Sequence, residues 1–257
     1  MVTVWVWASD GETEAGLVNQ EFAVIAFLRR NLPGARVDRL FPTRLKPAGK
    51  PGQVPLAPRS GLTGSALVSE LRAYVTGRGR ALLQAGDIVV LLDDVDCRFC
   101  EPDCGDRGCA ERFRWWRDEL ARAMPEGVEL VALLAAPEME GWFVTTWDRS
   151  FHQPLLRKGW TDGAVHAARK RVHARLGRSP ETWGRGGPVA GCEEKFSEIL
   201  VAILAEASPP GVGGTAYSKR LDGPSMLAGL DAETISRSHR RYFAPGWRRL
   251  KARSTRR

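Results

Sequence analysis

Residues 88–109 read IVVLLDDVDCRFCEPDCGDRGC, and the opening of this stretch decides the fold. The five apolar residues Ile88–Leu92 predict a strand buried on both faces, as in parallel sheets that helices cover. Asp93, Asp94 and Asp96 follow directly, at the predicted carboxyl end of the strand. Carboxylates suit a hard cation such as Mg²⁺, whereas the thiolates that come next suit a soft one such as Zn²⁺. The stretch therefore holds one metal site, two adjoining sites or only a surface loop.

The segments on either side of this strand alternate between strand and helix patterns. Further strands are predicted at Val2–Ala8, Val37–Phe41 and Val128–Ala135. Helices are predicted at Leu17–Leu32, Ser65–Thr76, Ala110–Ala123, Met139–Trp147, Gly163–Leu176 and Cys192–Ala207. This alternation predicts an α/β fold with a mostly parallel sheet flanked by helices, followed by a mainly helical C-terminal part. We expect an α/β core over 1–150, a helical extension over 151–236 and a basic C-terminal tail over 237–257.

The composition fits an ordinary globular chain. The 257 residues are 43% hydrophobic and 26% charged, which is typical of a soluble protein. The first residues lack the pattern of a signal peptide, and no run approaches the roughly 18 apolar residues of a membrane span. We therefore expect a cytoplasmic protein without membrane contact. Thiols stay reduced there, so clustered cysteines indicate metal or redox chemistry before disulfides.

The net charge of +8 comes from the C-terminus. Residues 237–257 hold nine of the 38 Lys and Arg residues and none of the 30 acids. Basic side chains with interleaved aromatic ones could contact phosphates and stack on bases. The alternative is a solvated, partly disordered tail whose aromatic side chains dock it on the core. The candidate nucleic-acid-binding arginines of this segment are Arg240, Arg241, Arg248 and Arg249.

Acidic residues follow three of the predicted strands. These residues are Asp10, Glu12 and Glu14 after the first strand, Asp93, Asp94 and Asp96 after the central one, and Glu138 and Glu140 after 128–135. The carboxyl ends of parallel strands lie on one edge of a sheet, where α/β proteins place their ligands. Gathered carboxylates repel one another, so they usually need a cation, and oxygen ligands favour Mg²⁺ or Mn²⁺. The alternative is that strand ends are polar anyway and that helix N-termini favour acids.

Four short motifs carry a family resemblance. LLDDVDC, at 91–97, resembles the strand-end DxD of TOPRIM domains, the fold shared by topoisomerases, primases and overcoming-lysogenization-defect nucleases. WASDGETE, at 7–14, stands where that family shows a glutamate followed by glycine. PEMEGWF, at 137–143, is similar to the E-x-E-x-W signature of an uncharacterised TOPRIM-like family found beside ATPases in bacterial defence islands. YSKRLDGPSMLAGLD, at 217–231, looks like the C-terminal Tyr-x-Lys…Gly…Asp motif of that family.

The resemblance spans Val4 to about Leu250 and implies a TOPRIM-like core with a Mg²⁺- or Mn²⁺-dependent nuclease activity. It also points to a role in antiviral defence, with an ATPase subunit as partner. The motif positions imply the catalytic acids Asp10, Asp94, Asp96, Glu138 and Glu140, with Asp94, Asp96 and Glu140 as metal ligands.

Three matched positions need a comment. Asp10 is one methylene shorter than the family's glutamate, so it reaches the metal through water or Glu14 takes its place. Tyr217 and Lys219 are expected to meet a phosphate, the alternative being a surface loop. Trp142 follows Glu140 in an apolar segment, and we expect it in the core rather than stacked on a base.

Four cysteines follow the DxD directly. Cys97, Cys100, Cys104 and Cys109 form a C-x2-C-x3-C-x4-C run, and four thiolates at short spacings can close a tetrahedral structural zinc site. The alternatives are free or redox-active thiols, or an iron–sulfur cluster. A zinc ion here would be structural, because four thiolates leave no open coordination position, and it would hold Asp96 at a fixed angle.

Two functions of different classes follow from these patterns. The first is a metal-dependent nuclease acting on DNA or RNA, with the acids on the metal and with Lys219 and the basic tail on the backbone. The second is a non-catalytic, zinc-containing module that binds nucleic acid or protein on a TOPRIM-like scaffold, with Asp10 marking a degraded site. The sequence does not predict the oligomeric state.

Overall fold

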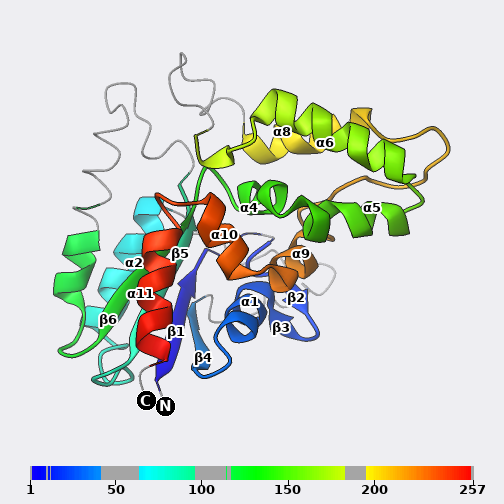
Figure 1. Ribbon diagram of the computed structural model, residues 1–257. Helices are drawn as coiled ribbons and strands as arrows, with labels where there is room; N and C mark the ends of the chain where they lie inside the picture. Colours follow the sequence, from blue (N-terminus) through cyan, green and yellow to red (C-terminus); the bar gives the residue numbers. More distant parts are fainter. Residues whose placement is uncertain are drawn as a thin grey trace, which may run out of the picture.

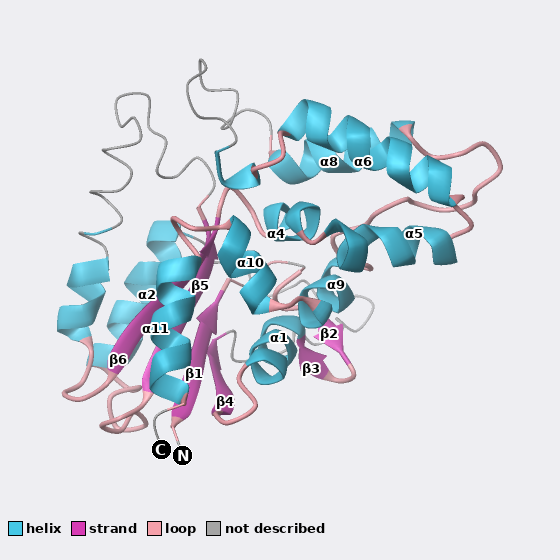
Figure 2. Ribbon diagram, viewed as in Figure 1, coloured by secondary structure: helices cyan, strands magenta, loops and turns pink. Residues whose placement is uncertain are grey.

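The computed structural model describes residues 2–9, 11, 13–41, 64–95, 114, 117–182 and 195–255. At its centre lies a parallel sheet of four strands in the order β4-β1-β5-β6 (Figures 1 and 2). The strands are β1 (Thr3–Ala8), β4 (Arg36–Phe41), β5 (Ile88–Asp94) and β6 (Glu129–Ala135). All four coincide closely with predicted strands, and the predicted α/β fold with a parallel sheet flanked by helices is confirmed.

The central position of β5 explains its unbroken apolar run. This strand pairs with β1 on one side and β6 on the other, and Ile88 lies opposite both Val4 and Glu129. Successive side chains of a strand point to opposite faces, so Val90 and Leu92 pack in one apolar cluster while Val89 and Leu91 pack in another. Both faces therefore demand apolar residues until the strand reaches its carboxyl end.

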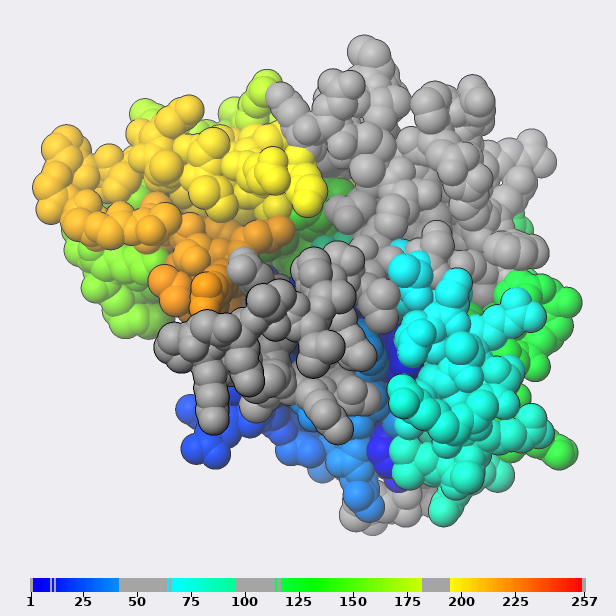
Figure 3. Space-filling model, turned by 180° about the vertical axis from the view of Figure 1, so that it is seen from behind, coloured from blue at the N-terminus to red at the C-terminus, as the bar shows by residue number. Residues whose placement is uncertain are grey.

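Helices cover both faces of the sheet. One face packs against α1 (Ala23–Asn31) and α11 (Ala244–Ser254), and the other packs against α2 (Gly64–Thr76) and the helical residues 117–123. Figure 3 views the molecule from the α2 side, where this helix appears in cyan. The remaining helical segments are α4 (Glu140–Thr145), the π-helix η2 (Asp148–His152), α5 (Gln153–Arg157), α6 (Asp162–Leu176), the 3-10 helix η3 (Pro180–Thr182), α8 (Phe196–Glu206), α9 (Gly223–Gly229) and α10 (Ala232–Ser238).

The predicted helix over Leu17–Leu32 is wrong in its first part. Residues 17–22 form a short antiparallel hairpin of β2 (Leu17–Val18) and β3 (Glu21–Phe22), and α1 begins only at Ala23. Asn19 and Gln20 adopt positive φ values of 51° and 68°, which build a two-residue turn between these strands. The apolar spacing was compatible with a helix, but the local turn prevails.

The basic C-terminal segment is a packed helix. Trp247 and Leu250 of α11 are buried against the sheet, and Gly246 lies so close to β6 that a Cβ atom there would come 2.0 Å from the carbonyl oxygen of Ala132. Of the two alternatives for this segment, the partly disordered tail is wrong for residues 237–255, although its aromatic side chains do dock on the core. A cluster of buried residues from Val4 to Leu250 joins all three predicted parts, whose boundaries stay a prediction.

Within the described ranges, no helix is long and apolar enough to cross a membrane.

Candidate active site at the carboxyl edge

Carboxylates from three strand ends meet at the carboxyl edge of the sheet. Asp94 closes β5 opposite Ala135, the last residue of β6, and Glu138 and Glu140 follow Ala135 within five residues. Glu14 lies in the loop after β1 and interacts electrostatically with Glu140. The structure thus brings Glu14, Asp94, Glu138 and Glu140 together, as the sequence predicts. Asp10, Glu12 and Asp96 lie outside the described residues, so their part in the site stays a prediction.

Glu14 is held by the loop that carries it. Ser9, directly after β1, donates a hydrogen bond of 2.7 Å from Oγ to Glu14 Oε1, and only 4% of Glu14 is exposed. The carboxylate folds back over Gly11, where a Cβ atom would lie 2.5 Å from Glu14 Oε2. A glycine at position 11 therefore makes room for this carboxylate, which explains physically why a glycine suits this loop.

The two aspartates of β5 have different partners because they point to opposite faces. Asp93 Oδ2 accepts a hydrogen bond of 2.7 Å from the backbone N–H of Gly64 and so anchors the start of α2. Asp94 Oδ1 accepts one of 2.9 Å from the backbone N–H of Met139, just before α4. Alternation along the strand thus separates Asp93 from Asp94, and Asp94 lies close enough to Lys219 to act on its charge.

Lys219 lies among these carboxylates. Its Nζ atom is 3.3 Å from Glu138 Oε2 and 3.7 Å from Glu140 Oε1, and it donates a hydrogen bond of 2.7 Å to Ser197 Oγ. Burial disfavours the charged ammonium, but Glu140, Glu138 and Asp94 outweigh this effect and raise the pKa of Lys219 above its ordinary value. The side chain that we expected on a phosphate is thus engaged with the acids.

Glu140 is more deeply buried than Glu14, Asp94 and Glu138, with 1% of the residue exposed. Burial raises the pKa of its carboxyl group to about 7, Lys219 opposes the rise, and Glu138 and Glu14 add to it. Tyr217, which is 2% exposed, donates a hydrogen bond of 3.0 Å from its hydroxyl to Glu140 Oε1. Burial and the adjoining Glu140 raise the pKa of Tyr217, so its hydroxyl stays a donor.

The segment that carries Tyr217 and Lys219 is pinned at both ends. Lys158 Nζ donates to the carbonyl oxygens of Thr215 and Ala216, each at 3.1 Å, and binds Asp222 Oδ2 at 2.8 Å. Just beyond, Gly223 packs on the loop after β1, where a Cβ atom would lie 2.7 Å from Thr13 Oγ1. These contacts bring the late motif to the first-strand loop, which is more than 200 residues away in sequence.

The donor set at this edge fits a hard divalent cation in its chemistry. Glu14, Asp94, Glu138 and Glu140 supply only oxygen ligands, which Mg²⁺ and Mn²⁺ prefer. The packing has not arranged them as a finished site, because no group of three acids, histidines or cysteines among the described residues is placed to hold a metal ion. Lys219 lies between two of the acids instead.

The candidate arginines lie at two different edges. Arg240 and Arg241 precede α11 beside Tyr242, which packs on Val95 and Ala136 near the carboxyl ends of β5 and β6. Arg249 binds Glu129, the first residue of β6, and therefore lies toward the amino edge. Arg248 is exposed in the middle of α11.

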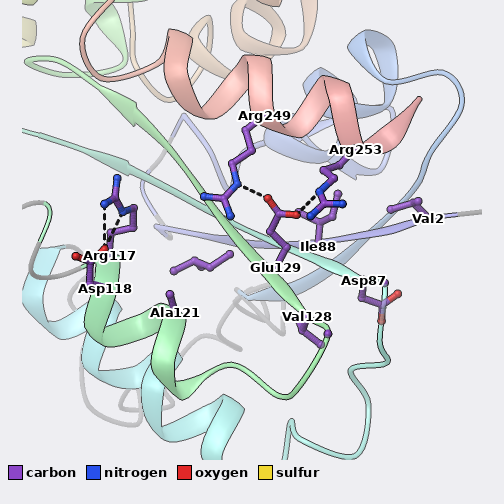
Figure 4. A pocket seen from close by; sticks show the side chains of 13 residues that line it. Val2, Asp87, Ile88, Arg117, Asp118, Ala121, Val128, Glu129, Arg249 and Arg253 are labelled. Carbon is purple, nitrogen blue, oxygen red and sulfur yellow. Dashed lines mark hydrogen bonds and ion pairs between the residues drawn. The ribbon is translucent and has the colours of Figure 1, made fainter. Parts of the chain in front are cut away.

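A cavity of about 710 Å³ opens at this amino edge (Figure 4). Arg249 and Arg253 reach into it from α11 and converge on the carboxylate of Glu129, while Arg117 lies across the cavity beside Asp118. The cavity is thus lined by ion pairs and lies at the opposite end of the sheet from the gathered acids.

Sequence reasoning missed three residues of the site. Ser9, Ser197 and Lys158 hold Glu14, Lys219 and the segment 215–222. Ser197 and Lys158 belong to no recognised motif, and Ser9 lies within WASDGETE at a position to which the resemblance gives no role. Only Ser197 offers a signal in the sequence, because it is a polar residue in the first turn of an apolar helix, where it is buried. Trp142 is 0% exposed, so its predicted place in the core is confirmed. Cys97, Cys100, Cys104 and Cys109 lie outside the described residues, and the zinc site stays a prediction.

Comparison with models of protein families, with curated proteins and with solved structures finds no match to this chain.

Proposed function

We propose that the protein is a metal-dependent phosphodiesterase that cleaves nucleic acid at the carboxyl edge of a TOPRIM-like sheet. The observation that carries this proposal is the meeting of Glu14, Asp94, Glu138 and Glu140 from three strand ends. Carboxylates gathered in this way repel one another and favour a bound cation, and their oxygens favour Mg²⁺ or Mn²⁺. A bound ion of this kind activates water and stabilises negative charge on a phosphate.

The side chains divide the work between holding the cation and holding the substrate. Asp94, Glu138 and Glu140 would hold the ion, together with Asp96 and with Asp10 or Glu14 at the first strand. Tyr217 keeps Glu140 oriented through its hydroxyl, and Ser9 does the same for Glu14. Arg240 and Arg241, near the same edge, bind the nucleic-acid backbone. By resemblance, the proposal includes a structural zinc ion on the four cysteines and an ATPase partner in a defence system.

The proposal is tested by cleavage of single- and double-stranded DNA and of RNA with Mg²⁺ or Mn²⁺. The double variant Asp94→Asn, Glu138→Gln should lose activity on the order of 100-fold or more, because metal sites depend on each ligand. Asp87→Asn is the matched control, since Asp87 precedes the same strand at its amino end, where it accepts a hydrogen bond of 2.8 Å from Trp5 Nε1. Cleavage that survives the double variant overturns the assignment of the site.

A second function has a specific observation in its favour. Asp94 already accepts a backbone hydrogen bond from Met139, and Lys219 already neutralises part of the charge on Glu138 and Glu140. Carboxylates used in this way can hold a scaffold together without catalysis, and the protein would then be a binding module. Tight binding of nucleic acid without cleavage of any substrate by either metal supports this second function and rejects the first.

A further inference from the structure

The ammonium of Lys219 occupies the place between two carboxylates that a cation would take. Its Nζ lies 3.3 Å from Glu138 Oε2 and 3.7 Å from Glu140 Oε1. An ammonium has three N–H donors, and Ser197 Oγ supplies a further acceptor at 2.7 Å. The ammonium thus has two hydrogen-bond acceptors, Glu138 and Ser197, and lies within ion-pair distance of Glu140. The lysine therefore fits this position well.

The carboxylates are fixed, whereas the lysine has a way out. The side chains of Glu138 and Glu140 are 4% and 1% exposed, but that of Lys219 is 36% exposed. Lys158 and Asp222 hold the backbone on both sides of Lys219. A swing of the long lysine side chain toward solvent therefore needs no movement of the backbone or of the acids.

We propose that Lys219 is an internal competitor of the divalent cation at this site. Its ammonium holds Glu138 and Glu140 in the metal-free protein, and a divalent cation binds these carboxylates by displacing it. Two cations cannot share the same carboxylate oxygens at these distances without strong repulsion. The lysine therefore sets the metal affinity of the site and offsets the repulsion between the two carboxylates when metal is scarce. This inference rests on the proposed function, because it takes the carboxyl edge as the metal site.

The test measures Mn²⁺ binding to the metal-free, full-length chain by titration calorimetry and by the electron paramagnetic resonance signal of free Mn²⁺. Lys219→Met keeps the length of the side chain and removes the charge, so the variant should bind Mn²⁺ at least about 10-fold more tightly than the wild type. Lys251→Met is the matched control, because Lys251 pairs with Glu233 at 2.6 Å on the surface of α11. Its Mn²⁺ affinity should equal that of the wild type.

Ser197→Ala covers the case in which Lys219→Met fails to fold without metal. This variant keeps every charge but removes the acceptor that orients the ammonium, so its Mn²⁺ affinity should rise about 2- to 5-fold. Adding Glu138→Gln and Glu140→Gln to either variant should abolish the tight Mn²⁺ binding. Such a loss shows that the ion binds at these two carboxylates.

The outcomes separate the two proposals. Equal affinities of wild type, Lys219→Met and Ser197→Ala overturn the competition by Lys219 and leave the metal site standing. Absence of Mn²⁺ binding in every variant overturns both the competition and the metal site.

Discussion

At the scale of single residues, Glu140 and His239 are buried ionisable groups near Gly141 whose pKa values move in opposite directions. Burial raises the pKa of Glu140 to about 7 and lowers the pKa of His239, which is 0% exposed, to about 4. Folding therefore favours the protonated carboxyl group and the neutral imidazole. The contribution of Glu140 to stability is fully present below pH 4.5 and is lost as the pH rises through about 7. The contribution of His239 is fully present above pH 6.5 and is lost as the pH falls through about 4.

We predict that the two effects oppose each other in the wild type and separate in single variants. Between pH 4.5 and 6.5, the free energy of unfolding of Glu140→Gln should rise with pH, because the titration of His239 is then no longer opposed by that of Glu140. That of His239→Gln should fall with pH over the same window. The total change in the free energy of unfolding across this window is at most about 3 kcal/mol for each variant, since one pKa unit corresponds to about 1.4 kcal/mol. Urea unfolding in the presence of a chelator measures both, and slopes of the same sign in the two variants contradict the prediction.

The sequence predicts which acids form the site but not the side chains that bind them. Asp94, Glu138 and Glu140 stand at strand ends, so the period of a strand and the rule for parallel edges suffice to place them. The sequence predicts that Lys219 meets a phosphate, because its motif does not show which carboxylates lie beside it in the folded protein. Its pairing with Glu138 and Glu140 depends on a close approach between distant segments, which no local pattern encodes.

At the scale of elements, the packing of α11 on β6 depends on one glycine. A Cβ atom at Gly246 would lie 2.0 Å from the carbonyl oxygen of Ala132, and the obstacle is backbone that cannot rotate away. We predict that Gly246→Ala lowers the free energy of unfolding by about 3 kcal/mol, as overpacking does. Thermal and urea unfolding measure the loss.

Gly163→Ala is the matched control for this prediction. Gly163 also lies in the first turn of a helix, α6, but a Cβ atom there would meet nothing within 4 Å. The control should leave stability unchanged or raise it by up to about 1 kcal/mol, because alanine favours helices over glycine. An equal loss in both variants shows that helix propensity rather than close packing governs position 246.

Elements were predictable where burial and period agree. The four strands of the sheet and α6 have apolar patterns whose period matches the side chains that are buried in the structure. The β2–β3 hairpin was missed because Leu17, Val18 and Phe22 fit a helical spacing equally well. The sequence did not predict α11 as a helix because its many basic residues dominate the pattern. Its buried face consists of few residues, with Trp247 and Leu250 as the two large apolar side chains.

At the scale of the whole molecule, the sheet separates two chemically different ends. The carboxyl edge gathers acids around Lys219, while the amino edge carries a cavity in which arginines already bind carboxylates. The alternation of strands and helices predicts which edge collects the acids, because all parallel strands end there. It could not predict which edge receives the arginines, because that depends on the direction in which α11 runs along the sheet.

This separation predicts where nucleic acid binds. Arg240 and Arg241 lie near the carboxyl edge, so replacing both with glutamine should weaken binding of a single-stranded oligonucleotide about 10-fold in the presence of a chelator. The slope of log affinity against log salt should become shallower by about 1 to 2, because binding releases about one counterion fewer for each phosphate contact that is lost. Arg249→Gln with Arg253→Gln is the matched control, because both side chains already bind Glu129 at the far edge. Fluorescence anisotropy across a salt series measures these slopes. A larger loss in the control pair than in Arg240→Gln, Arg241→Gln would place the nucleic acid at the amino edge, away from every acid that could act on it.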